Sequence, residues 1–404
     1  MTRQPPFFRL KPALVLLTGM ALAGCISKPE SLPTKPANPS AQGKVQTEPQ
    51  PATRPSALPA SPAAQAASEP ASAPKAQPTA PAPGGSYAAR LDAMAFADEL
   101  ARRHRLDPQW VRQIIGQSRF NATVARLMQP PTKTFVKSWR VYRSRFIDPV
   151  RIAAGVRFWQ ANGATLARAE KEYGVPAEII VGIIGVETIY GRDTGTFRVM
   201  DALMTLGFDF PANHPRAAER SAYFKSEVEQ FVVLQSQNKA NALDIKGSYA
   251  GAMGLPQFMP SSWAKYAVDF DGDGTIDLWK SPPDIIGSVA SYFKAHHWQS
   301  GMPTHYPVTL DRSRLDMEAL MAPDIVPTFS VASFTDKGAV LKGAALQHKG
   351  PLALIELLNG ADAPGYVAGT ENFYAITRYN WSSYYAMAVI ELGREVAARV
   401  KPRD

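Results

Sequence analysis

The sequence has almost no cysteine, and three further absences narrow its class. Cys25 is the only cysteine in 404 residues, so no internal disulfide can form. No repeat at a solenoid period occurs, and no aromatic–basic motif of an RNA or DNA reader is visible. The apolar run near the N-terminus is too short for a comfortable membrane span. These absences argue against a disulfide scaffold, a repeat protein and a nucleic-acid-binding protein.

The chain does contain enough apolar sequence for a large core, together with an excess of basic residues. Hydrophobic residues make up 45% of it, and its length suits one large domain or two ordinary ones. The net charge of +9 favours an anionic partner, such as nucleic acid, an acidic membrane surface or an anionic polymer.

The N-terminus resembles the export signal of bacterial lipoproteins. Arg3, Arg9 and Lys11 precede a short apolar run, as in a secretory signal. The run ends at "LAGC", which is similar to the lipobox, where the signal is cut before a cysteine that then carries lipid. We therefore expect a signal peptide over residues 1–24 and lipidation of Cys25. The alternative is an ordinary signal peptide with an incidental cysteine.

Two features of the exported protein predict its location. Ile26 stands where the inner-membrane retention signal of lipoproteins has Asp, which points to the periplasmic side of the outer membrane. Without residues 1–24 the chain keeps 41 basic and 35 acidic residues, so its charge is +6. That charge suits the anionic cell wall as a partner better than a cytosolic nucleic acid.

Residues 25–86 form a low-complexity segment. Fourteen of the 35 prolines lie between Pro29 and Pro83, among Ala, Ser, Gln and Thr. Such a segment cannot bury enough apolar surface to fold. It is a semi-extended spacer that could reach on the order of 150 Å. We expect the folded domain to occupy residues 87–404.

The folded part is predominantly helical up to about residue 298. Asp107–Pro108 and Asp148–Pro149 are helix starts, and Gly174 ends the second of these helices. Apolar periodicity predicts further helices over residues 91–106, 177–190 and 214–237.

The last hundred residues predict a small mixed subdomain. Short strands or extended loops are expected between residues 304 and 347, with a helix near 315–322. Residues 351–358 are a strand or a helical turn, and a helix begins at about Ser382. The fold class is therefore α+β, predominantly α.

Glu187 is the one acid in the apolar segment "VGIIGVETIYG". A helix over 177–190 that is apolar nearly all round is buried, and Glu187 lies near its C-terminal end. Burial and the helix dipole both raise the pKa of a carboxyl there, which suits a general acid. The alternative is a structural ion pair with a neighbour such as Arg192.

Two further stretches can line a site. Residues 246–263, "KGSYAGAMGLPQFMPSSW", are rich in glycine, which lets backbone approach a ligand closely, and Ser261 or Ser262 can cap the helix that follows. The stretch "ENFYAITRYN" places Tyr374 and Tyr379 near each other, and aromatics with a polar tip suit sugar rings. The alternatives are an irregular structural loop for residues 246–263 and core packing for the two tyrosines.

Five motifs resemble, in order, the membrane-bound lytic murein transglycosylase B family over roughly residues 90–400. They are "EIIVGIIGVETIYGR", "SYAGAMGLPQFMPSSW", "VDFDGDGTIDLW", "IIGSVASYFKAHHW" and "NFYAITRYNWSSYYAMAV". The resemblance implies a lysozyme-like core, a helical subdomain and a small mixed α/β subdomain. It also implies non-hydrolytic cleavage of the β-1,4 bond between N-acetylmuramic acid and N-acetylglucosamine in peptidoglycan, with 1,6-anhydromuramyl products.

The resemblance assigns roles to residues of this chain. Glu187 matches the family's single catalytic carboxylate, which acts first as acid and then as base. No cofactor is expected for catalysis. Motif position implies that Ser248 and Gln257 hold the saccharide and that Tyr292, Tyr374 and Tyr379 line the groove. Arg220 matches a basic residue that can meet the peptide stem or the lactyl carboxylate. The family commonly has an arginine before Arg220; Glu219 stands there in this chain, and Arg216 is the available substitute.

An acidic loop predicts a structural calcium ion. In "DFDGDGTID", Asp269, Asp271 and Asp273 occupy positions 1, 3 and 5 of an EF-hand-like loop, and Thr275 can ligate through its carbonyl. Position 12 is not Glu, so Asp284 is the expected closing ligand. The alternative is a solvated acidic turn.

Two other functions remain compatible with the sequence. A hydrolytic muramidase would need a second acid across the groove, such as Asp193. A non-catalytic lipoprotein that binds peptidoglycan would keep the groove and lack the chemistry. Protein partners are not predicted by any motif.

Overall fold

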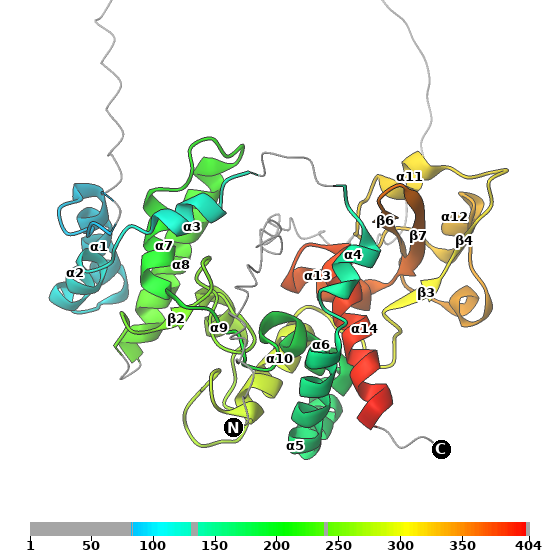
Figure 1. Cartoon of the computed structure of the whole chain (residues 1–404), viewed down its shortest axis with the longest axis horizontal. Coiled ribbons are helices and arrows are strands. Elements are labelled where there is room, and N and C mark those ends of the chain that lie inside the picture. The colour runs from blue at the N-terminus through cyan, green and yellow to red at the C-terminus, as the bar shows by residue number, and fades with distance from the viewer. Residues whose placement is uncertain (1–81, 83, 131–135, 238–240, 401–404) are drawn as a thin grey trace, which may run out of the picture. The chain divides into compact units, whose positions relative to one another are not determined.

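The computed structural model describes residues 82, 84–130, 136–237 and 241–400 (Figure 1). The predicted signal peptide, Cys25 and nearly all of the 25–86 spacer lie outside the described residues. Within the described part, no helix has both the length and the apolar character needed to cross a membrane.

The first helices form a helical subdomain. Asp107 caps α2 through its side chain, which accepts a hydrogen bond from the Gln109 backbone, as its sequence position predicts. Tyr87 and Arg90, which precede α1, both donate hydrogen bonds to the carboxylate of Asp209 at the end of α7. These bonds join the start of the domain to α7. The helices are α1 (Leu91–His104), α2 (Pro108–Gly116), α3 (Ala122–Leu127), α7 (Val199–Phe208) and α8 (Ala217–Gln237).

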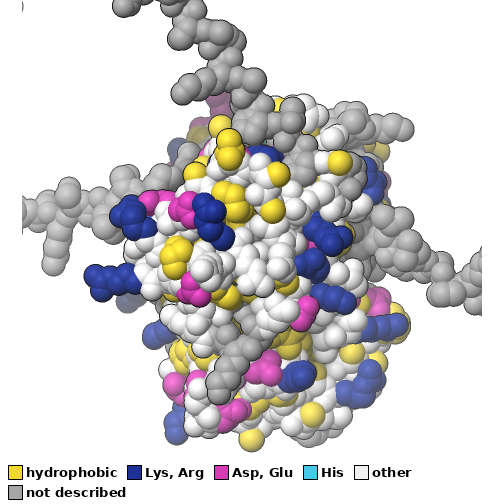
Figure 2. All heavy atoms as spheres, turned by 90° about the vertical axis from the view of Figure 1, so that its left-hand side faces the viewer, with side chains coloured by type: hydrophobic (Ala, Val, Ile, Leu, Met, Phe, Trp, Pro, Cys, Tyr) yellow, Lys and Arg dark blue, Asp and Glu magenta, His cyan; other side chains and the backbone are white. Residues whose placement is uncertain are grey.

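Charges of both signs alternate over the face that carries α1 and α2 (Figure 2). Arg102 pairs with Glu99 within α1, and Arg112 of α2 pairs with Asp98 of α1. The excess positive charge of the chain is therefore not gathered into a single basic patch on this face.

The central helices pack around α6 (Ala177–Thr188), which is buried along almost its whole length. Its close neighbour α14 (Ser383–Val400) runs antiparallel to it, because Gly182 lies against Val389 and Gly393 against Glu178. A Cβ on Gly393 would lie 2.0 Å from the Glu178 carbonyl oxygen, so only glycine permits this approach. The surrounding helices are α5 (Pro149–Tyr173), α9 (Pro260–Tyr266), α10 (Pro282–Ala295) and α13 (Glu371–Tyr379).

A small mixed subdomain has its own apolar cluster, which includes Leu320, Phe334 and Leu352. Its main sheet is antiparallel with strand order β3-β7-β6, and a second pair joins β4 to β5. The strands are β3 (His305–Pro307), β4 (Thr309–Leu310), β5 (Ala339–Val340), β6 (Ala353–Asn359) and β7 (Asp362–Gly369), with helices α11 (Met317–Met321), α12 (Val331–Asp336) and η1 (Gly343–Gln347).

The fold confirms the predicted class, which is mostly helical with small sheets, and corrects two local expectations. Residues 331–336 are helical rather than extended, because Ser330 caps them through its side chain. Neither Ser261 nor Ser262 caps α9; Pro260 begins that helix, and Ser261 instead donates to the buried carboxylate of Glu227.

Candidate active site

Glu187 lies in the last turn of α6, where the apolar helix meets the surface. The three residues after Thr188, Ile189 to Gly191, have left-handed backbone angles that turn the chain sharply away. Its side chain is partly buried, and its Oε1 accepts a short hydrogen bond from the hydroxyl of Tyr385, which is 1% exposed. Glu187 is thus held by a neutral donor rather than by Arg192, which the sequence left as its alternative partner.

Burial sets the protonation of this carboxyl. It raises the pKa of Glu187 to about 7, and the hydrogen bond from Tyr385 opposes part of that rise. Near neutral pH a substantial fraction of the molecules therefore holds a proton on Glu187, as a general acid must.

The glycine-rich segment forms a compact loop beside the end of α6. Gly247 pairs with Phe197, so that β2 (Lys246–Gly247) lies against β1 (Phe197–Arg198), and it also bridges to Met253. The Oγ of Ser248 accepts hydrogen bonds from the backbone of Ala250 and Ala252 at 3.3 and 3.0 Å. Ser248 therefore shapes this loop and leaves its side chain only partly buried.

Two side chains fasten the loop, one to the acid-bearing helix and the other to the segment that follows this helix. The hydroxyl of Thr188, next to Glu187, donates to the carbonyl of Leu255 at 3.0 Å. Gln257 has a left-handed backbone and donates from Nε2 to the carbonyls of Gly254 and Thr194, at 2.9 and 3.2 Å. These bonds bring Gln257 to the same end of α6 as Glu187.

Stacked tyrosines close the other side. Tyr379 lies parallel to Tyr385, with ring centroids 6.4 Å apart, and its hydroxyl donates to the carbonyl of Pro256 at 2.5 Å. A continuous set of contacts thus runs from Glu187 through Tyr385 and Tyr379 to the glycine-rich loop. Tyr374 is partly buried further along α13, with the Arg378 guanidinium 5.8 Å from its ring centroid.

Two of the predicted substrate-binding residues are largely buried. Tyr292 is 6% exposed, packs against Tyr379 and donates to the carbonyl of Arg378 at 2.7 Å. Arg220 is also 6% exposed, with its guanidinium over the ring of Phe210. Both lie mainly beneath the surface.

The substituted basic position forms an ion pair. Glu219 binds the guanidinium of Arg216 through both carboxylate oxygens, and both side chains are exposed. Arg216, the expected substitute for the family's arginine, is therefore paired with the glutamate that occupies that arginine's position.

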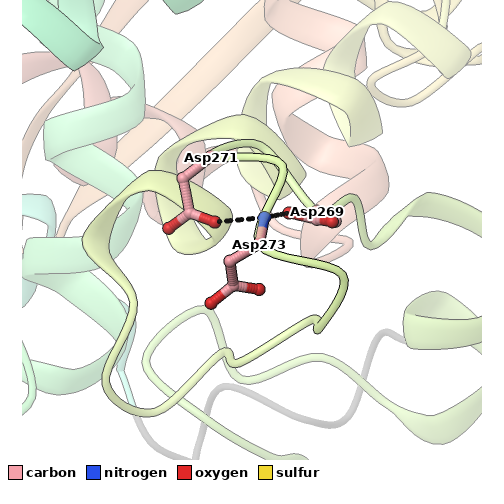
Figure 3. Close-up of side chains that lie close together, drawn as sticks. All are labelled: Asp269, Asp271 and Asp273. Atoms are coloured by element: carbon pink, nitrogen blue, oxygen red, sulfur yellow. Dashed lines mark hydrogen bonds between the residues drawn. The ribbon is translucent and has the colours of Figure 1, made fainter.

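The acidic loop gathers three carboxylates, which point toward one another (Figure 3). Asp269, Asp271 and Asp273 each offer an oxygen within 4.8 Å of the others, and all three are exposed. Backbone N–H groups, Gly274 first among them, lower the pKa of Asp269, so this carboxylate stays ionised. Clustered oxygen donors on a tight glycine turn are the ligand type that calcium prefers.

Asp284 is not part of this cluster in the described residues. It is 1% exposed, and its two oxygens accept from the backbone of Phe270 and Asp277 at 2.8 and 2.9 Å. It fixes the two ends of the loop rather than facing the three aspartates. Thr275 lies on the loop, where its backbone donates to Asp273.

Sequence reasoning missed Tyr385 and Tyr142. The pKa of Tyr142 is raised by burial and by the nearby charge of Glu187, so this residue of α4 (Trp139–Ser144) also lies close to the acid. Tyr385 belongs to the fifth motif quoted above, and that membership was a usable signal. Tyr142 lies before the first motif and offered none.

Comparison with known proteins gives one consistent result. The model of the transglycosylase SLT domain matches residues 89–394. The chain belongs to this transglycosylase family. The chain is 44% identical over 335 residues to membrane-bound lytic murein transglycosylase B of Escherichia coli, with 79% of this chain and 86% of that protein covered.

Two solved structures extend the comparison. Soluble lytic transglycosylase SltB1 of Pseudomonas aeruginosa is 42% identical, with a TM-score of 0.69 over 76% of this chain and 99% of its own. E. coli lytic transglycosylase Slt35 in complex with calcium is 40% identical, with a TM-score of 0.67 over 79% and 96%. The transglycosylase fold is therefore lysozyme-like with small sheets, as the motifs implied, and the protein is a peptidoglycan lytic transglycosylase.

Proposed function

We propose that the protein cleaves the β-1,4 bond between N-acetylmuramic acid and N-acetylglucosamine without water, using Glu187 alone. Protonated Glu187 gives its proton to the glycosidic oxygen, and the bond from that oxygen to muramyl C1 breaks. The Glu187 carboxylate then takes the proton of the muramyl C6 hydroxyl, whose oxygen bonds to C1. The products are a 1,6-anhydromuramyl end and a free N-acetylglucosamine hydroxyl, and Glu187 is protonated again. The substrate's N-acetyl group can assist at C1.

The observation that carries this proposal is the environment of Glu187. Its pKa of about 7 lets one group hold a proton for the first step and accept one in the second. Its hydrogen-bond partner is Tyr385, a neutral group, so no fixed cation holds the carboxylate permanently ionised. Most glycoside hydrolases instead need two carboxylates, one of which activates water or bonds to the sugar.

The residues around the acid supply the groove in this proposal. Ser248, Gln257 and Tyr379 belong to the loop and the aromatic stack that meet at the end of α6. Tyr374 extends the aromatic side, and Tyr292 and Arg220 support the groove from beneath. The basic end would then depend on Arg220, because Arg216 is engaged by Glu219.

We further propose that Cys25, exposed by removal of residues 1–24, carries lipid on the periplasmic side of the outer membrane. The segment 25–86 would tether the catalytic domain, residues 87–404, to that membrane. The support is the lipobox-like sequence and the membrane-bound relative in E. coli.

We also propose a structural calcium ion on Asp269, Asp271 and Asp273, with the Thr275 carbonyl as a further ligand. The clustered carboxylates and the calcium complex of Slt35 support it. The ion would hold a turn ahead of α10 and takes no part in the reaction. Asp284 would act through the loop backbone.

Mass spectrometry of a digest of purified cell wall tests the reaction. We expect muropeptides with 1,6-anhydromuramyl ends. Reducing ends would indicate a hydrolytic muramidase, and an unchanged wall would indicate a binding protein without activity.

A substitution then tests the role of Glu187. Glu187→Gln keeps the shape of the side chain and removes the proton, so turnover should fall by about 10²–10⁴-fold while the circular dichroism spectrum and wall binding stay unchanged. A fully active Gln variant would reject the assignment. The same substitution at Glu172, which is exposed near the end of α5, is the matched control and should keep activity.

A further inference from the structure

A cavity of about 500 Å³ lies where α4 and β6 meet the start of α14. Tyr142 and Tyr384 form part of its wall, with ring centroids 5.6 Å apart. Tyr384 directly precedes Tyr385, the hydrogen-bond partner of Glu187. The cavity wall therefore includes the residue next to the hydrogen-bond partner of the proposed acid, and none of the groove residues described above lines it.

The wall of this cavity carries charges of both signs. Lys137 and Arg145 flank α4, while Asp324 and Glu356 come from the segment after α11 and from β6. Among the described residues, no acidic side chain forms an ion pair with Lys137 or Arg145 within 4.0 Å.

The other arginines of α4 are engaged elsewhere. Arg140 pairs with Asp362, and Arg143 pairs with Glu391. Among the described residues that line the cavity, Lys137 and Arg145 are therefore the basic side chains that can meet a ligand carboxylate.

Apolar side chains lie between these charges. Val136, Val141 and Leu358 line the cavity and are 78%, 53% and 38% exposed. Ile325 and Leu354 form a buried floor. A fitting ligand would thus combine small apolar groups with at least one carboxylate and one ammonium group.

We propose that this cavity, which we call the stem cavity, binds the peptide that muramic acid carries. The inference rests on the proposed function, because the peptide begins on the muramyl sugar that Glu187 would attack. A stem peptide offers alanine methyl groups, free carboxylates and, where a diamino acid is present, an ammonium group. A glycan without its peptide keeps only the lactyl carboxylate of muramic acid and has no ammonium group, and a lipid chain offers no ammonium group for Asp324 and Glu356.

Binding measurements on the full chain test the stem cavity directly. The ligands are N-acetylglucosaminyl-N-acetylmuramic acid with and without an L-Ala–D-Glu–diaminopimelate peptide, compared by calorimetry. We expect the peptide to tighten binding roughly tenfold, as charged hydrogen bonds at a partly exposed site do. Lys137→Ala/Arg145→Ala should bring the two affinities within about twofold. Equal affinities for the native protein, or a preference that the double variant keeps, would overturn the proposal.

Two further variants sharpen the result. Lys342→Ala/Lys349→Ala removes the same charge from exposed positions of the mixed subdomain outside the cavity, and should keep the preference. Asp324→Ala should weaken binding of the diaminopimelate peptide and leave an L-Ala–D-Glu peptide unaffected. Equal weakening of both peptides would contradict the ammonium contact.

A kinetic arm separates this inference from the proposed function. On peptide-bearing glycan strands the double variant at Lys137 and Arg145 should lose about tenfold in rate. On strands stripped of peptides by an amidase it should match the native protein. If neither substrate yields anhydro ends, the proposed reaction fails while the calorimetry still decides the stem cavity.

Discussion

At the scale of single residues, the site depends on one carboxyl and one phenol from distant parts of the chain. Glu187 and Tyr385 are 198 residues apart and meet through a short hydrogen bond. Burial favours the neutral form of each group, so the pKa of Tyr385 is also raised. Glu187 can therefore hold a proton near neutral pH, and Tyr385 remains a neutral hydrogen-bond donor to the carboxylate that is left when Glu187 releases it.

The pH dependence of the reaction follows from this pKa. The first step needs protonated Glu187, whose pKa is about 7, so kcat/KM should fall as pH rises through about 7. Initial rates on soluble peptidoglycan fragments between pH 5 and 9 measure this. A rate that keeps rising through pH 8 would mean that Glu187 is not the acid.

Removal of the Tyr385 hydroxyl should change the pH at which kcat/KM falls, the basic limb of the pH profile. The hydrogen bond from Tyr385 lowers the pKa of Glu187, so Tyr385→Phe should shift the fall in rate to higher pH. The carboxyl also loses its orientation, and kcat should drop roughly 10–100-fold. Tyr306→Phe removes a hydroxyl in the mixed subdomain, 3.4 Å from His348 Nδ1, and should leave the limb in place. An unmoved limb in Tyr385→Phe would show that the phenol has no such effect.

The sequence predicts Glu187 but not its partner. An acid in an apolar helix is visible from the local pattern, because a helix that is apolar nearly all round is buried and burial raises the pKa of a carboxyl. The bond to Tyr385 depends on how α14 crosses α6, and the burial of Tyr292 and Arg220 depends on packing from several elements. No local pattern encodes these contacts.

At the scale of elements, α6 and α14 form the scaffold of the site. Their backbones touch at Gly182 and Gly393, so the end of one helix and the start of the other are fixed relative to each other. The spacing between Glu187 and Tyr385 is therefore a property of helix packing.

Filling this contact should destabilise the domain. In Gly393→Ala the new Cβ would lie 2.0 Å from the Glu178 carbonyl oxygen, which forces the helices apart and should cost about 1–3 kcal/mol. Gly163→Ala in α5 meets nothing within 4 Å and should gain about 0.5–1 kcal/mol. Urea unfolding followed by circular dichroism measures both, and equal stability of the two variants would contradict the packing argument.

The acidic loop provides a second test at this scale. Calcium at a free concentration of about ten times its Kd should raise Tm by about 2–4 °C, and a chelator should reverse the change. Asp271→Asn/Asp273→Asn should abolish the shift, and magnesium at equal concentration is the control ion. If calcium leaves the Tm of the native chain unchanged, the loop is a solvated turn.

Element prediction succeeded where the signals were local. The caps at Asp107 and Asp148 and the αL residue Gly174 begin and end helices as predicted. The strand β7 was not predicted, because "DAPGYVAG" has weak apolar alternation and is held by pairing on both sides, with β3 and β6. A strand that is stabilised mainly by pairing with its neighbours has little recognisable pattern in its own sequence.

At the scale of the whole molecule, the predicted lipid and spacer decide where the catalytic domain can work. Cys25→Ser removes the acceptor of the lipid and should move the protein from the membrane fraction to the soluble periplasmic fraction. Fractionation followed by immunoblotting measures this, with Ser27→Ala as control. Retention of Cys25→Ser in membranes would mean that another anchor exists.

The backbone contact between α6 and α14 also bears on thermal inactivation. Because those helices cannot slide past each other, the proton donor has no way to drift out of alignment while the rest of the domain stays intact. Heating should therefore abolish activity and the helical circular dichroism signal over the same temperature range. An enzyme whose acid lies on a loosely packed lid would instead lose activity well below its melting temperature.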